Sequence, residues 1–144
     1  MVFVFDENFS HWLVTAMHFL EQGNQFRTTT NTEVYHILKL AEELQYPKIG
    51  ASYKDDDVIK MTASKSGILL THDDDFRRIK HLSKLFKANN VGVFFFQTHN
   101  DSRGYWNMVN NLIKRWPEIK EKAENTVPPF YFCIKKTGIH QYSF

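Results

Sequence analysis

The stretch Ile68-Leu69-Leu70-Thr71-His72-Asp73-Asp74-Asp75-Phe76 points most directly to the fold, because a short apolar run ends there in three consecutive acids. Neighbouring carboxylates at the end of a buried strand repel one another and lose hydration, which a fold tolerates most readily when a cation is bound. The first strand candidate has the same form, since Val2-Phe3-Val4-Phe5 leads into Asp6-Glu7-Asn8. Two apolar strands that each end in acid predict one shared acidic pocket.

Apolar runs alternate with amphipathic segments along the rest of the chain. The pattern predicts strands at 2–5, 25–30, 68–71, 91–96 and 130–135, the last of these being the final strand. It predicts a first helix that Ser10 caps and Gly23 stops, and a second that runs from Asn31 or Thr32 to Pro47. Three further helices are predicted at 55–66, at 75–88, and at 103–116 with a further turn or two after Pro117. Alternating strands and helices are typical of a mostly parallel α/β sheet flanked by helices, and we expect one domain, 1–144.

Composition excludes several classes of protein. With 42% hydrophobic and 24% charged residues, the chain reads as a soluble globular protein, and its net charge of +2 gives no bulk signal for nucleic-acid binding. Cys133 is the single cysteine, which excludes an intrachain disulfide and a cysteine-based zinc site and agrees with a cytoplasmic location. We expect neither a signal peptide nor a membrane span, because no apolar run approaches the necessary length.

Three acidic clusters stand out, at 6–8, 55–57 and 73–75. Taken singly, each has an ordinary explanation, because acids cap helices and complement the helix dipole, and this explanation is favoured for 55–57 alone. Taken jointly, clusters at the ends of two strands and the start of a helix favour a pocket for Mg²⁺ or Mn²⁺, which prefer oxygen ligands. Metal-dependent hydrolysis of a phosphodiester is the chemistry that such a pocket would support.

These residues resemble the PIN-like nucleases, in particular the small VapC-like toxins of toxin–antitoxin pairs. The shared pattern comprises Phe5-Asp6-Glu7-Asn8, Asp56 ahead of Ile59 and Ala63, Gly67, Thr71-x-Asp73-x-Asp75-Phe76, and Val91-Gly92-Val93. The combination of the first and fourth motifs carries most of the specificity. The spacing to Ala63 selects Asp56 over its two acidic neighbours.

The resemblance implies a three-layer sandwich around a mostly parallel central sheet. It further implies that Asp6, Asp56, Asp73 and Asp75 form a catalytic site for Mg²⁺ or Mn²⁺ that cleaves RNA, with Thr71 orienting a carboxylate or a water. The implied partners are the RNA substrate and a cognate antitoxin protein, and a homodimer is left open.

A basic segment follows the acidic stretch directly, and we assign RNA phosphate contacts to Arg77, Arg78, Lys80 and Lys84. Tyr105 and Trp106 are interpreted as core residues. Two alternatives stay open. One is a catalytically inactive PIN-like module that binds RNA or protein. The other is an aspartyl-phosphate phosphoryl-transfer domain, which would need a lysine near the position that Gln97 occupies after a strand.

Overall fold

The computed structural model of the chain describes residues 1–28, 31–48, 50–73, 80–97 and 104–143. The described strands are β1 (Val2–Phe5), β2 (Glu33–His36), β3 (Ile68–Thr71), β4 (Gly92–Phe96), β5 (Tyr131–Lys135) and β6 (Gly138–Tyr142). The described helices are α1 (His11–Gln25), α2 (Ile37–Glu43), α3 (Asp55–Ser64), α5 (Lys80–Asn89) and α6 (Gly104–Asn125).

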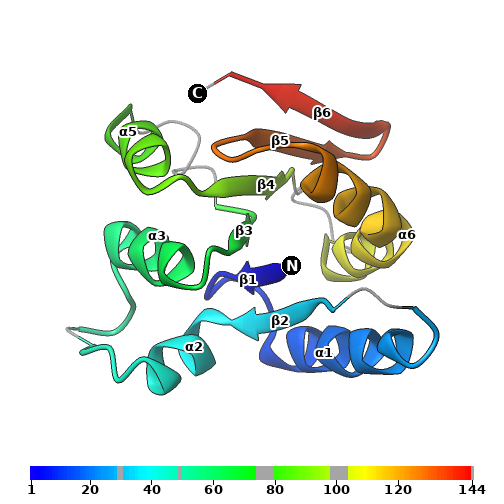
Figure 1. Cartoon of the computed structure of the whole chain (residues 1–144), viewed down its shortest axis with the longest axis horizontal. Helices are drawn as coiled ribbons and strands as arrows, with labels where there is room; N and C mark the ends of the chain where they lie inside the picture. Colours follow the sequence, from blue (N-terminus) through cyan, green and yellow to red (C-terminus); the bar gives the residue numbers. More distant parts are fainter. Residues whose placement is uncertain (29–30, 49, 74–79, 98–103, 144) are drawn as a thin grey trace.

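The strands form one sheet in the order β2-β1-β3-β4-β5-β6 (Figure 1). All neighbouring pairs are parallel except β5 and β6, which are antiparallel. Parallel neighbours place their carboxyl ends at one edge of the sheet, and in such sheets the ligand crevice lies beyond that edge. The register pairs Phe5 with Leu70, so the residues that follow β1 lie beside the last residue of β3.

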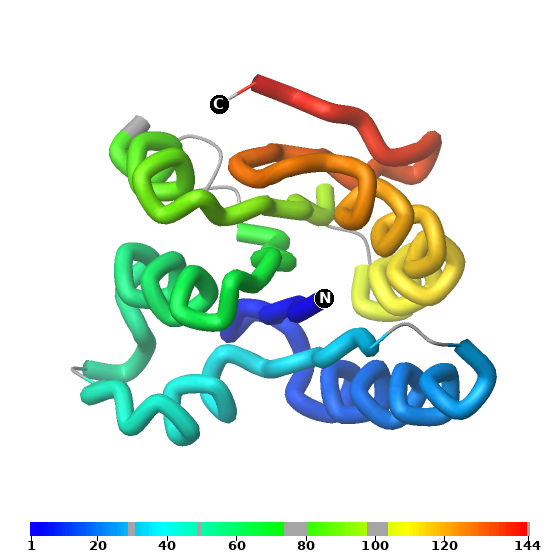
Figure 2. Tube along the Cα trace, in the orientation of Figure 1, coloured from blue at the N-terminus to red at the C-terminus, as the bar shows by residue number. Residues whose placement is uncertain are grey.

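Successive side chains of a strand point to opposite faces of the sheet. Helices cover both of these faces. Phe3 and Phe5 pack with side chains of α1 and α6, whereas Val4 packs with side chains of α2, α3 and α5. The two groups of helices lie on opposite sides of the strands (Figures 1 and 2). The mixed α/β fold with a mostly parallel sheet, predicted from the sequence, is therefore confirmed, and its layers agree with a three-layer sandwich.

The second strand and the second helix differ from the sequence prediction. Residues 25–28 do not form a strand, because α1 continues through Gly23 to Gln25 and the amides of Arg27 and Thr28 then donate to the carbonyl of Asn24. The strand is β2, whose residues pair with β1, and it occupies the start of the segment predicted as a long helix. Only α2 remains of that helix, with His36 as its N-cap.

The carboxyl-terminal third also departs from prediction. Residues 104–125 form one continuous helix that contains Pro117, where we expected an interruption. Strand β5 is not the last strand, since β6 pairs with it as a hairpin. Within β4, the ring of Phe130 covers Gly92 so closely that a Cβ there would lie 2.3 Å from a ring carbon. In the described part of the chain, no helix is both long enough and apolar enough to span a membrane.

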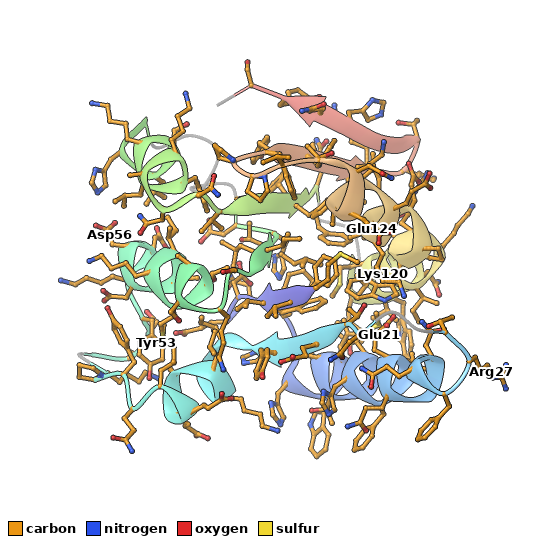
Figure 3. The ribbon with its side chains drawn as sticks, viewed as in Figure 1. Glu21, Arg27, Tyr53, Asp56, Lys120 and Glu124 are labelled. Carbon is orange, nitrogen blue, oxygen red and sulfur yellow. The ribbon has the colours of Figure 1, made fainter. Side chains whose placement is uncertain are left out.

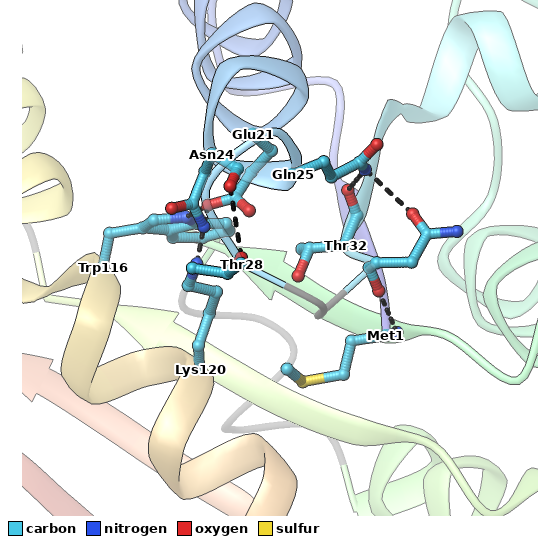
Figure 4. Close-up of polar contacts among 9 residues, drawn as sticks. Met1, Glu21, Asn24, Gln25, Thr28, Thr32, Trp116 and Lys120 are labelled. Atoms are coloured by element: carbon cyan, nitrogen blue, oxygen red, sulfur yellow. Dashed lines mark hydrogen bonds and ion pairs between the residues drawn. The ribbon is translucent and has the colours of Figure 1, made fainter.

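A buried polar contact pins α1 to α6 (Figure 4). Glu21 on α1 accepts hydrogen bonds from Trp116 Nε1 at 2.5 Å and from Lys120 Nζ at 2.9 Å. Burial by itself would raise the pKa of Glu21, but the bonds from Lys120 and Trp116 outweigh it and hold that pKa below its usual value. The Trp116 ring also contacts Phe3, with centroids 4.8 Å apart. The contact therefore fixes both helices on the same face of the sheet.

Candidate active site at the ends of β1 and β3

Asp6 and Thr71 form the centre of the candidate site. Asp6 directly follows β1, and its backbone N–H donates to the carbonyl of Leu70 at 3.1 Å, which extends the strand pairing by one residue. The Asp6 carboxylate, only 3% exposed, accepts the Thr71 hydroxyl through Oδ2 and the amide of Asn8 through Oδ1 at 3.0 Å. A single buried carboxylate therefore joins the ends of two parallel strands.

Asp73 lies in the same cluster, because its backbone N–H donates to Thr71 Oγ1 at 3.0 Å. The Thr71 hydroxyl thus donates to one acid while accepting from the amide of another. Burial raises the pKa of Asp6 to about 6, and the charge of Asp73 adds to that rise. The Thr71 hydroxyl, the His72 ring and the Asn8 amide act in the opposite direction. The site therefore holds a carboxylate that is poorly compensated for its loss of water.

Two histidines fasten the loop that carries Asp6. His36 is buried, and its Nδ1 accepts from the Leu38 amide at 3.3 Å, so its Nε2 carries the proton and donates to the Phe9 carbonyl at 3.0 Å. Burial lowers the pKa of His36, which favours this neutral form. His72 Nε2 donates to the Asn8 carbonyl at 2.6 Å. The backbone after Asp6 is thereby held from β2 and from the segment after β3.

The acids of α3 are engaged by other groups. Asp56 Oδ2 lies 3.2 Å from His81 Nε2 of α5, and the Asp56 side chain is 40% exposed. Asp57 accepts the Tyr46 hydroxyl at 2.8 Å. Figure 3 shows Asp56 and Tyr53 on the side of the sheet that carries α3, away from Glu21 and Lys120. The structure thus brings Asp6, Thr71 and Asp73 together, whereas the Asp56 carboxylate contacts His81 of α5.

The predicted fourth acid, Asp75, lies outside the described residues. Glu7, next to Asp6, accepts a hydrogen bond from the Tyr53 amide at 2.7 Å and so holds the loop before α3. Within the described ranges, no three histidine, cysteine, aspartate or glutamate side chains come close enough together to hold a metal ion. The described part of the site is therefore a pair of aspartates linked through a threonine.

A cavity of about 370 Å³ lies elsewhere, between α1, β2 and α2. His11, His18 and His36 line it together with Glu33, Lys39 and Glu43. The rings of His11 and His36 are 5.7 Å apart, and burial keeps His36 uncharged. Asp6, Thr71 and Asp73 do not line this cavity, so the cavity and the acidic cluster are separate features.

The predicted RNA-contacting residues are only partly described. Arg77 and Arg78 lie outside the described residues, and of Lys80 the structure describes only its place at the start of α5. Lys84 is exposed on the same helix. Tyr105 and Trp106 are exposed in the first turn of α6, so their interpretation as core residues is wrong. The two rings lie 5.6 Å apart, centroid to centroid.

Sequence reasoning missed His36 and Glu7 as supports of the site. Both act through backbone groups that are remote in sequence, since His36 bonds Phe9 and Glu7 bonds Tyr53. The one available signal for Glu7 was its place in the acidic cluster 6–8, and that cluster was interpreted as part of a metal pocket. For His36, assignment to a helix interior concealed its position at a strand end.

Comparison with known proteins now adds to this geometry. A comparison with curated proteins gives no significant match, and a comparison with solved structures gives none either. A family model described as a PIN like domain matches residues 1–98, which include β1 to β4 and every acid discussed above. The chain therefore belongs to the PIN-like domain family.

Proposed function

We propose that this protein is a metal-dependent endoribonuclease that hydrolyses RNA phosphodiester bonds. The observation that carries the proposal is the pair of aspartates, Asp6 and Asp73, linked through Thr71 at the carboxyl edge of a PIN-like sheet. PIN-like domains are commonly nucleases. A buried acid at this edge is a costly feature that packing alone does not explain.

The donor set suits a divalent cation. Burial raises the pKa of Asp6 to about 6, which is the response of a carboxylate that lacks a compensating positive charge. Mg²⁺ is commonly held by one or two carboxylates, with waters and substrate phosphate oxygens as its other ligands, and Mn²⁺ accepts similar oxygen donors. Asp6 and Asp73 would bind the cation, with Asp56 and Asp75 as the further acids proposed for the site.

Each residue of the cluster has a separate task in this proposal. Thr71 and the Asn8 amide hold the Asp6 carboxylate in one orientation, which leaves its remaining lone pairs for a cation. A bound cation would polarise the scissile phosphate and lower the pKa of the attacking water. An aspartate of the set that does not bind the cation would accept the proton of that water.

The RNA would approach from α5 and the start of α6. Arg77, Arg78, Lys80 and Lys84 are the proposed phosphate contacts, and the exposed position of Lys84 supports this assignment. The exposed rings of Tyr105 and Trp106 offer faces on which unpaired bases can stack. Gln97 follows β4 where an aspartyl-phosphate domain would need a lysine, which favours nuclease chemistry over phosphoryl transfer.

The test is a cleavage assay on end-labelled single-stranded RNA, run with Mn²⁺, with Mg²⁺ and with EDTA. We expect internal cleavage products with either metal and none with EDTA. Asp73→Asn should abolish cleavage, whereas Asp57→Asn is a matched control that should leave it unchanged, because Asp57 is bonded to Tyr46. An Asp73→Asn protein that cleaves as fast as wild type would overturn the proposal. A wild type that binds RNA without cleaving it would identify an inactive RNA-binding module.

We further propose that the enzyme is the toxin of a cytoplasmic toxin–antitoxin pair. The Asp6-Glu7-Asn8 motif, combined with the motif from Thr71 to Phe76, supports this role. Induced expression in a bacterial host should arrest growth, and Asp73→Asn should relieve the arrest. Co-expression of the adjacent gene should restore growth if that gene encodes the antitoxin. Normal growth on wild-type expression, despite cleavage in vitro, would refute the toxin role alone.

A further inference from the structure

Helix α1 carries two opposite apolar faces. Its inner face, which includes Leu13, Val14 and Met17, packs against the sheet. On the opposite side lies a second row, which we name the outer stripe: Trp12, Ala16, Phe19, Gly23 and Phe26. Successive members are spaced by four, three, four and three residues, the spacing of a helix-packing seam. A helix that is apolar on both faces is normally buried on both.

The outer stripe is open to solvent. Trp12 is 80% exposed, Phe19 is 64% exposed and Phe26 is 92% exposed, and Leu20 beside them is exposed as well. Single exposed aromatic residues are unremarkable, but three large rings aligned along one helix form a continuous apolar patch of the kind that marks an interaction site. The patch is therefore the clearest unpartnered surface in the described part of the molecule.

The outer stripe also lacks formal charge. Glu21 is the only Asp, Glu, Lys or Arg among residues 11–25, and it is buried in its contact with Lys120. The chain as a whole is 24% charged, so a helix surface without such residues is unusual for one that faces water. A neutral surface of this kind can pack against an identical copy of itself without repulsion between like charges.

We propose that the outer stripe is the interface of a homodimer, in which α1 of one copy packs antiparallel against α1 of the other. The stripe alternates large and small residues. An antiparallel pairing centred between positions 17 and 18 sets Trp12 against the partner's Gly23 and Phe19 against the partner's Ala16. Gly23 offers the necessary space, since a Cβ built there would meet no atom within 4 Å. Twofold symmetry forms each of these contacts twice.

The available area suits this occupant. Aromatic side chains bury roughly 150–250 Å² each, so the exposed parts of the three rings and Leu20 would remove on the order of 500 Å² per copy. A standard protein interface buries about 800 Å² per partner, and residues flanking the stripe would supply the remainder. The proposed dimer does not involve the acidic cluster, so a test of the dimer is independent of the proposed nuclease activity.

The test measures the mass of the full-length protein by light scattering after gel filtration at micromolar concentration. Wild type should have twice the 17.1 kDa mass of one chain. Phe19→Lys and Ala16→Glu should each give a monomer, because each places a charge twice in the interface, and dimer affinity should fall by at least about 100-fold. Ile113→Lys, on the exposed surface of α6, is the matched control and should remain dimeric.

Mixing the two interface variants tests the proposed register. The lysine at position 19 would face the carboxylate at position 16 of the other variant, so the mixture should form a heterodimer although neither variant dimerises alone. Circular dichroism of each variant shows whether it is folded. A monomeric wild type would overturn the proposal. The same holds if the monomer binds a different protein through the outer stripe. A dimer that survives both Phe19→Lys and Ala16→Glu would overturn it equally.

Discussion

Replacing Asp6 by asparagine should stabilise the metal-free protein at neutral and alkaline pH. Burial raises the pKa of Asp6 from 3.8 to about 6. Between these values the native state binds more protons than the unfolded state, so the contribution of Asp6 to stability declines as the pH rises through this range. Above about pH 6 the whole cost of ionising the buried acid is present. A rise of about two pKa units corresponds to about 3 kcal/mol.

Asparagine removes this cost but also changes one contact. Its carbonyl can still accept the Asn8 amide, whereas its NH₂ group cannot accept the Thr71 hydroxyl and must donate to it instead. The pKa of about 6 already includes the preference of the Thr71 bond for the charged acid. What remains is the loss of an ordinary hydrogen bond, which costs on the order of 1 kcal/mol net. The variant should therefore gain about 2 kcal/mol of unfolding free energy at about pH 8, and it should gain nothing at about pH 4.

Urea unfolding in EDTA, followed by tryptophan fluorescence, measures this difference at each pH. Asp57→Asn serves as the control, because its carboxylate is half-buried and already paired with Tyr46, and it should show no gain. The reasoning fails if Asp6→Asn is no more stable than wild type at about pH 8, or if its gain does not grow with pH. Added Mn²⁺ should stabilise wild type and leave the Asp6→Asn protein nearly unchanged.

Three further changes test other parts of the structure. Thr71→Val removes the hydroxyl that lowers the pKa of Asp6, so that pKa should rise and the acidic limb of the cleavage profile against pH should move to higher pH. Glu21→Ala leaves the Trp116 N–H without its acceptor in a buried site, and urea unfolding should show a loss of about 3 kcal/mol. Because the folded-state pKa of Glu21 is lowered, this loss should shrink as the pH falls through that pKa. Lys84→Ala should weaken RNA binding about tenfold. The slope of the logarithm of the binding constant against the logarithm of salt concentration should become shallower by about one.

The strand ends were predictable, but their alignment was not. The apolar runs before Asp6 and Asp73 indicated buried strands, and parallel strands that end in acid indicated a common edge. The pairing of Phe5 with Leu70, which sets Asp6 against Thr71, is a tertiary register that no local pattern encodes. The contact between Asp56 and His81 likewise depends on the packing of α3 against α5.

The mistaken second helix has a specific physical cause. Val34, Ile37 and Ala41 recur at helical spacing, and the run from 31 to 47 contains no glycine to interrupt it. Pairing with β1 outweighs this periodicity at residues 33–36, which become β2. Strand β6 escaped prediction because three of its five residues are exposed, so its sequence lacks the apolar alternation of a buried strand.

The rate of RNA cleavage as a function of Mn²⁺ concentration, measured for wild type and Asp73→Asn on the same single-stranded RNA, tests the central claim most directly. The linked pair Asp6 and Asp73 predicts a wild-type rate that rises with Mn²⁺ and saturates, and no measurable rate for the variant at any concentration. A wild-type rate that does not depend on Mn²⁺, or equal rates for the two proteins, would contradict the assignment of this cluster as the catalytic site.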